Sequence, residues 1–142
     1  MKLKPLTPEQ NNLLCDIAIH AMESCVCNEV EIPVEHFVYE GVYYRTCFIP
    51  KDVAIIGAYI QIPTTVIVNG DCYVTLGNTV GRLKGYNVIQ AESGRRQAFR
   101  ALEDTHITMC FRTDKVDLRE CEKEFTPEWM LLTTNRKELI KE

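Results

Sequence analysis

The sequence has little histidine, no long apolar run and no excess of positive charge. Of its 142 residues only 3 are histidine, and 16 Lys and Arg stand against 20 Asp and Glu, for a formal net charge of −4 at pH 7. A chain with this balance is not expected to bind extended nucleic acid, which requires many phosphate contacts. No window approaches the roughly 18 apolar residues of a membrane span, so no membrane partner is expected.

Signals for secretion are lacking as well. The first ten residues, MKLKPLTPEQ, contain no apolar run like that of a signal peptide. The 7 cysteines are an odd number, and we expect reduced thiols packed as small hydrophobic side chains. Both features predict a cytoplasmic location. Zinc binding by Cys15, His20, Cys25 and Cys27 is disfavoured, because five-residue steps would spread the first three around a helix.

The pattern that is present predicts one mainly β domain over 1–142. Thr7 and Pro8 are typical of a helix start, and apolar residues then recur at three- and four-residue steps. Short β-branched and aromatic runs follow, separated by turn signals such as Asn69-Gly70 and Gly77-Asn78, at a spacing typical of barrels and jelly rolls. The predicted parts are an N-terminal helix at 7–27, a β-barrel at 31–111 and a C-terminal extension with short helical segments at 114–142.

Two segments of the β region carry glycines at a known spacing. They are GAYIQIPTTVIVNG, from Gly57 to Gly70, and GYNVIQAESGRRQAF, from Gly85 to Phe99. These segments resemble the two motifs of the cupins, a superfamily of small jelly-roll barrels, and the resemblance covers about 43–111. It implies a single cupin-type jelly-roll β-barrel.

The metal-binding positions of the two cupin motifs hold other residues here. Gly57, Tyr59 and Pro63 stand where the family has two His and a Glu, and Gln97 stands where it has a third His. None of them offers the imidazole or carboxylate ligands on which transition metals rely in this fold. The resemblance therefore implies a barrel without a metal or other cofactor.

Three segments are also similar to small cupin-like proteins of bacteriophages. They are YIQIPTTVIVNGD, LKGYNVIQAESGRRQAF and LEDTHITMCF. The similarity implies a fold but no proven activity. For a phage-encoded protein, the expected location is the host cytoplasm.

Polar residues in both motif segments are candidates for a ligand site. In the cupin register, strand alternation would turn Tyr59, Gln61 and Gln97 into the barrel, where a hydroxyl and two amides would line an otherwise apolar cavity. Alternatively, these polar groups bond one another or water inside a filled barrel.

The segment SGRRQAFR is the most cationic of the chain. If Gln97 points inward, Arg96 and Arg100 point outward, and the run is then either a solvated edge or a salt-bridge surface between subunits. Arg95 follows the Ser93-Gly94 turn directly and is better placed to bind an anion at the barrel mouth. His106 shares a strand face with polar neighbours, and is either structural or a general base or anion contact.

These residues predict a metal-free, non-catalytic barrel that binds a small anionic ligand through Tyr59, Gln61, Arg95, Arg96, Gln97 and His106. Its most specific form is a phage sponge that sequesters a nucleotide-type signal of host defence. One alternative is a metal-independent isomerase or epimerase that uses His106, with Tyr59, as its base. Another is a phage structural or assembly protein. Apolar strand edges and the segment around Trp129 predict a homodimer or higher homo-oligomer.

Overall fold

The computed structural model describes residues 2–3, 32–76, 79–132 and 134–135. The predicted helix at 7–27 and the predicted Gly77-Asn78 turn lie outside these residues. The elements are β1 (Lys2–Leu3), β2 (Val34–Tyr39), β3 (Val42–Ile49), β4 (Ala54–Ile56), β5 (Thr64–Leu76), β6 (Thr79–Ala91), β7 (Ala98–Ala101), β8 (Thr105–Arg112), α2 (Leu118–Phe125) and the 3-10 helix η1 (Trp129–Leu131). The chain is mainly β, as the sequence predicts, and α2 and η1 lie in the C-terminal segment predicted to be helical.

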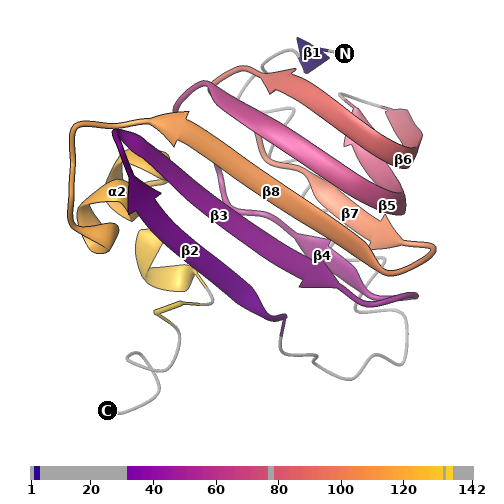
Figure 1. Cartoon of the computed structure of the whole chain (residues 1–142). Helices are drawn as coiled ribbons and strands as arrows, with labels where there is room; N and C mark the ends of the chain where they lie inside the picture. Colours follow the sequence, from indigo (N-terminus) through magenta and orange to yellow (C-terminus); the bar gives the residue numbers. More distant parts are fainter. Residues whose placement is uncertain (1, 4–31, 77–78, 133, 136–142) are drawn as a thin grey trace.

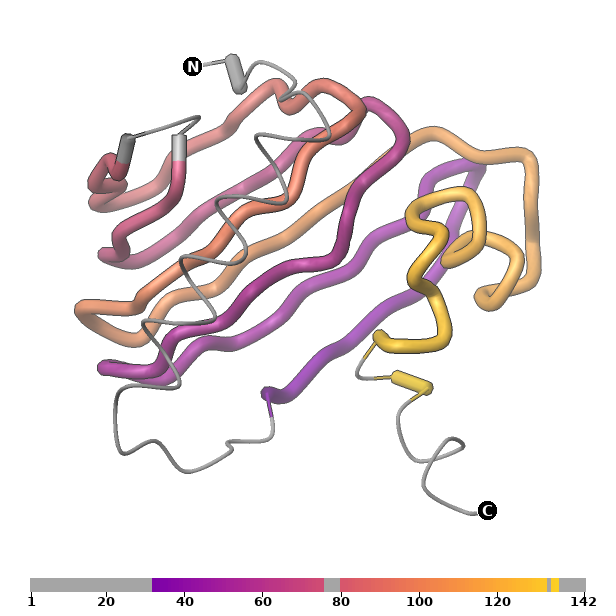
Figure 2. The backbone as a smooth tube through the Cα atoms, turned by 180° about the vertical axis from the view of Figure 1, so that it is seen from behind, coloured from indigo at the N-terminus to yellow at the C-terminus, as the bar shows by residue number. Residues whose placement is uncertain are grey.

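The strands form one curled sheet in the order β1-β6-β5-β8-β3-β2, with β7 paired to β5 and β4 paired to β7. All of these pairs are antiparallel except β1 with β6. Figure 1 shows the long strands side by side in front, with β4 and β7 behind them. Seen from the other side, the sheet curls around a central space and forms a half-barrel (Figure 2).

The hydrophobic core fills the space inside this curl. One cluster consists of inward residues from β3, β5, β6, β7 and β8, including Ile49, Val68, Phe99 and Ile107. A second cluster lies where α2 covers one end of the barrel and includes Tyr43, Ile60, Phe111, Cys121 and Phe125. Burying these side chains against α2 fixes the C-terminal segment on the barrel end.

The prediction of a tight turn at Asn69-Gly70 is wrong, because β5 continues through both residues. Gly70 marks the place where β5 changes partner: Asn69 pairs with His106 of β8, whereas Cys72 pairs with Ala101 of β7. A Cβ atom on Gly70 would lie 2.7 Å from the Cα of Thr105. The glycine therefore allows a close backbone approach at the bend of a long strand.

Candidate functional site

Arg95 lies at the barrel end that α2 covers, opposite Ile60 of the second core cluster. It forms an isolated antiparallel bridge with Ile60, in which the Ile60 N–H donates to the Arg95 carbonyl at 2.8 Å and the Arg95 N–H donates back at 3.3 Å. Directly opposite residues in an antiparallel pair point to the same side, and Ile60 points into the second core cluster. The side chain of Arg95 accordingly extends inward and is only 2% exposed.

The guanidinium of Arg95 is buried with most of its donors unused. Its Nη1 donates to the carbonyl of Glu92 at 2.6 Å, but its Nε and Nη2 are buried and have no hydrogen-bond partner among the described residues. Burial lowers the pKa of Arg95 to about 10, because desolvation disfavours the charged form. Buried polar groups are nearly always hydrogen-bonded, so these two N–H groups require an explanation.

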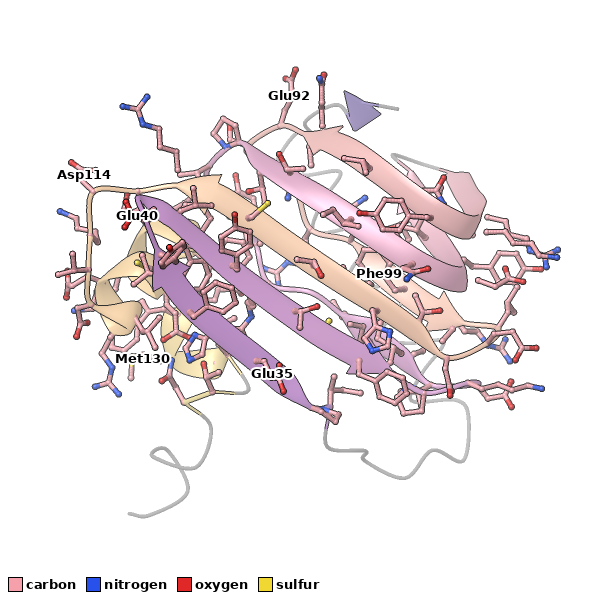
Figure 3. All side chains as sticks on the ribbon, viewed as in Figure 1. Glu35, Glu40, Glu92, Phe99, Asp114 and Met130 are labelled. Carbon is pink, nitrogen blue, oxygen red and sulfur yellow. The ribbon has the colours of Figure 1, made fainter. Side chains whose placement is uncertain are left out.

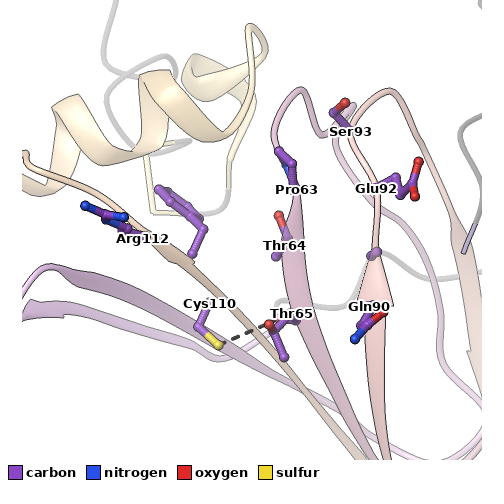
Figure 4. A pocket seen from close by; sticks show the side chains of 10 residues that line it. Pro63, Thr64, Thr65, Gln90, Glu92, Ser93, Cys110 and Arg112 are labelled. Atoms are coloured by element: carbon purple, nitrogen blue, oxygen red, sulfur yellow. Dashed lines mark hydrogen bonds between the residues drawn. The ribbon is translucent and has the colours of Figure 1, made fainter. Parts of the chain in front are cut away.

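A groove of about 430 Å³ lies where β5 begins and β6 and β8 end, and its lining includes Glu92 and Ser93 from the turn that precedes Arg95. Figure 4 shows Pro63, Glu92 and Ser93 around it, with Arg112 across the opening. Its lining residues are Pro63, Thr64, Thr65, Gln90, Ala91, Glu92, Ser93, Cys110, Phe111 and Arg112. The groove and Arg95 share Glu92, whose carbonyl accepts the Nη1 hydrogen bond.

Tyr59 and Arg96 contact the C-terminal segment through one carboxylate. The Tyr59 backbone N–H donates to Oε1 of Glu128, and Nη2 of Arg96 donates to Oε2, both at 2.8 Å. Each carboxylate oxygen therefore has a donor from the barrel. Arg96 thus forms a salt bridge within the chain, which joins the barrel to residue 128.

Gln61 does not face the barrel interior, contrary to the prediction. Its side chain is exposed, and its Nε2 donates to the carbonyls of Lys123 and Glu124 at 2.9 and 3.1 Å. Residues 57–63 lie outside the named strands, and their backbone bonds to the barrel are the Gly57 N–H to the Gln97 carbonyl and the bonds around the Ile60 bridge, so strand alternation does not hold there. Gln61 instead occupies the free carbonyls at the end of α2.

The side chains of Gln97 and His106 make their contacts elsewhere in the barrel, and not with the Arg95 guanidinium. Gln97 is half-buried and its Nε2 donates to the carbonyl of Thr75 at 3.2 Å. His106 is exposed on the outer side of β8, where its ring lies 5.0 Å from the ring of Phe48. Of the six predicted site residues, Arg95 alone combines an inward direction with unused donors.

A buried polar cluster at the other side of the barrel end was not predicted from the sequence. Nδ1 of His36 lies 3.0 Å from the Tyr43 hydroxyl, and Nη1 of Arg45 donates to that hydroxyl and to Oε2 of Glu122, each at 3.4 Å. Asn135 donates to the other oxygen of Glu122 at 3.3 Å. This network holds α2 against β2 and β3.

The environment of the cluster shifts two of its pKa values. Burial lowers the pKa of His36, an effect that nearby Glu122 opposes and Arg45 reinforces. Burial also raises the pKa of the Tyr43 hydroxyl. The inward face of β2, with Val34, His36 and Val38 at alternate positions, is the sequence signal that could have identified His36.

The residues at the four cupin metal positions do not fit a metal ion. Tyr59 and Gln97 take part in hydrogen bonds to neighbouring segments, and Gly57 and Pro63 carry no ligand atom in their side chains. Within residues 2–3, 32–76, 79–132 and 134–135, no group of three or more His, Cys, Asp or Glu side chains could hold a metal. Nor does any helix in this part of the chain have the length and hydrophobicity to cross a membrane.

Comparison with solved structures identifies the fold. An uncharacterized conserved protein with a double-stranded β-helix domain from Klebsiella pneumoniae superposes with a TM-score of 0.50 at 14% identity, covering 68% of this chain and 84% of that one. A cupin superfamily protein from Desulfitobacterium hafniense gives 0.48 at 12% identity, covering 65% and 86%. The Cupin_2 domain of a transcriptional regulator of the XRE family from Enterobacter cloacae gives 0.47 at 7% identity, covering 61% and 100%.

At such low identity the likeness defines the fold and nothing more. No protein-family model and no curated protein matches the sequence. The strand order, the curled antiparallel sheet and the likeness to the double-stranded β-helix protein define a mainly β fold of the jelly-roll type, as predicted.

Proposed function

We propose that the chain is a non-catalytic barrel that binds a small anionic ligand at Arg95. The observation that carries this proposal is the buried guanidinium, 2% exposed, with two N–H groups that have no partner within the described residues. An isolated buried charge is expensive unless an opposite charge compensates it. A bound anion would provide both the charge and the missing acceptors.

The groove lined by Glu92 and Ser93, which precede Arg95 in the sequence, supports this function. Its volume of about 430 Å³ falls in the range of roughly 300 to 1,000 Å³ that is usual for small-molecule sites. Arg112 at its rim adds a second positive charge, and Ser93 adds a hydroxyl. A small anion could therefore approach through a partly cationic opening.

A nucleotide-type signal of host defence, sequestered by a phage sponge, remains the most specific form of the proposal. The cation cluster supports it less than the sequence suggests, because Arg96 is paired with Glu128. Arg95 is then the remaining inward cation of that segment. The phosphate of a nucleotide is one anion that a guanidinium binds well.

Native mass spectrometry compared with the denatured mass tests this function first, because it detects any retained ligand. The matched variants are Arg95→Met, which removes the buried charge, and Arg100→Met, which removes an exposed arginine on the neighbouring strand β7. We expect retained or added anions to bind the wild type and Arg100→Met but not Arg95→Met. Equal binding by all three proteins, or none by the wild type, would overturn the proposal.

The isomerase alternative requires His106 to meet a ligand together with Tyr59. His106 is exposed beside Phe48, whereas Tyr59 contacts Glu128 of the C-terminal segment. Turnover of a sugar-type substrate by the wild type, lost in His106→Ala, would favour this alternative over the binding function.

We also propose that two copies associate through the outer face of the sheet, over which Figure 1 shows no helix or strand of the described residues. The registers place three outward residues from each of five strands on this face. They are Glu35, Phe37, Tyr39, Tyr44, Thr46, Phe48, Thr65, Ile67, Asn69, Tyr86, Val88, Gln90, His106, Thr108 and Cys110. A solvent-facing sheet surface usually carries many charges, yet Glu35 is the one acidic or basic residue among them besides His106.

A second copy fits this face by area and by charge. Five strands about 4.8 Å apart and three rows about 6.8 Å apart cover about 500 Å² per subunit, so two faces reach the roughly 1,000 Å² of a specific interface. Phe37, Tyr39 and Tyr86 are 54%, 67% and 67% exposed. Because these fifteen positions carry little charge, with Arg112 in the row of Tyr39 at the edge of the face, two copies of an acidic chain can meet there without strong repulsion.

Sedimentation analysis tests this association with one lysine on the face and one elsewhere. We expect a wild-type dimer, a monomer for Thr108→Lys at the centre of the face, and a dimer for Val116→Lys, which changes an exposed residue outside it. Circular dichroism checks that both variants are folded. A wild-type monomer, or a dimer that persists in Thr108→Lys, would contradict the association.

A further inference from the structure

The unused donors of Arg95 lie on one edge of its guanidinium. Nη1 is occupied by the Glu92 carbonyl at 2.6 Å, and the two nitrogens without a partner are Nε and Nη2. In a planar guanidinium these two nitrogens form a fork of nearly parallel N–H groups. The missing partner must therefore satisfy two neighbouring donors at once.

Arg82 shows how the same edge binds when it has a partner. Its Nε donates to Oδ1 of Asp71 at 2.9 Å, and its Nη2 donates to Oδ2 at 2.7 Å. Two oxygens of one anionic group thus fit the fork, which is the arrangement preferred by arginine with carboxylates and phosphates.

Arg95 differs from those arginines in the described part of the chain that pair with a carboxylate. Arg45 pairs with Glu122, Arg82 with Asp71 and Arg96 with Glu128. Arg95 is more deeply buried than any of these three, yet its Nη1 donates to a backbone carbonyl and its other nitrogens have no partner among the described residues. Of these four arginines, the most deeply buried is the one without a carboxylate partner.

The unused edge is held in place before any ligand arrives. The backbone of Arg95 is fixed by both hydrogen bonds of its bridge with Ile60, and the Nη1 contact with Glu92 restrains the plane of the guanidinium. A preorganised donor pair loses little conformational freedom on binding.

We propose that Nε and Nη2 of Arg95 bind, side-on, two oxygens of a single anionic group, either a carboxylate or a phosphoryl group of the ligand. This inference rests on the proposed anion-binding function and specifies its chemistry. A monatomic anion can satisfy only one of the two donors well, so the site discriminates by shape as well as by charge.

NMR of the arginine Nε–H signals tests the geometry directly. The probes are sodium phosphate, sodium acetate and sodium bromide, titrated at constant ionic strength into the wild type, Arg95→Lys and Arg100→Lys. We expect a saturable shift of the Arg95 Nε–H signal with phosphate or acetate and a much smaller one with bromide. Arg95→Lys keeps the charge but loses the fork, and we expect its affinity to fall by about tenfold or more, whereas Arg100→Lys binds like the wild type.

The outcomes distinguish a failure of the two-oxygen geometry from a failure of the proposed anion binding. If bromide binds as well as phosphate and acetate, or if Arg95→Lys binds as well as the wild type, the two-oxygen geometry is wrong but anion binding stands. If none of the three anions shifts the Arg95 signal, both are overturned. Tighter binding of phosphate than of acetate identifies a phosphoryl ligand, and the reverse identifies a carboxylate ligand.

Discussion

Two arginines are buried in the barrel, and their surroundings differ sharply. Arg45 on β3 is 9% exposed and Arg95 is 2% exposed. Arg45 donates to the Tyr43 hydroxyl and to the carboxylate of Glu122, which also accepts from Asn135. Arg95 has one carbonyl partner and two buried donors without any.

The difference separates a structural role from a binding role. The Arg45 network is closed on itself and joins α2 to the sheet, so it needs no further molecule. The hydrogen bonding of the Arg95 guanidinium is incomplete, and buried donors without a partner lower the stability of a protein. Strained or unsatisfied groups persist where function maintains them.

Removing the partner of Arg45 is expected to produce the largest effect on stability. Glu122→Ala leaves a buried guanidinium without its carboxylate and removes the acceptor for Asn135. We expect a loss of about 3 to 5 kcal/mol in the free energy of unfolding, measured by urea denaturation.

The matched control for this variant is Glu120→Ala in the same helix. Glu120 is exposed and pairs with Lys123 at 3.1 Å, so its removal should cost less than about 1 kcal/mol. Similar losses in the two variants would mean that the Arg45 network contributes little.

Removing the charge of Arg95 is expected to act in the opposite direction. In the absence of ligand, Arg95→Met replaces two unsatisfied buried donors with an apolar side chain of similar length. We expect the free energy of unfolding to rise by about 1 to 3 kcal/mol, with ligand binding lost. Destabilisation of the ligand-free protein by Arg95→Met would mean that the guanidinium stabilises the barrel, and the contrast with Arg45 would disappear.

The sequence predicted the mainly β architecture and singled out Arg95 as a candidate for the same reason. Both depend on local signals: alternating apolar residues for the strands, and the Ser93-Gly94 turn for the residue that follows it. Gly94 has a positive φ of 81°, which glycine adopts easily. Local chemistry of this kind can be read without knowing which segments meet in space.

The errors arise where distant segments decide the local structure. Gln61 was expected to face inward, but residues 57–63 bind the C-terminal segment and lose strand alternation. Asn69-Gly70 has the composition of a turn, yet Gly70 is needed for the close approach of Thr105. The ion pair between Arg45 and Glu122 spans 77 positions in the sequence, and no spacing rule predicts such a pair.

The smallest expected effect is in the pH dependence of stability, and it concerns His36 in the network around Arg45. Burial holds the pKa of His36 below its usual value of 6.5, so the folded protein favours the neutral ring. The unfolded chain then binds more protons in the window below pH 6.5, and stability rises with pH there. The contribution of His36 is fully present above pH 6.5 and is lost as the pH falls through the folded pKa. His36→Asn should flatten this part of the curve of unfolding free energy against pH. An unchanged slope in His36→Asn would show that the closed network around Arg45 tolerates a charged ring, and that satisfaction of hydrogen bonds matters more there than charge.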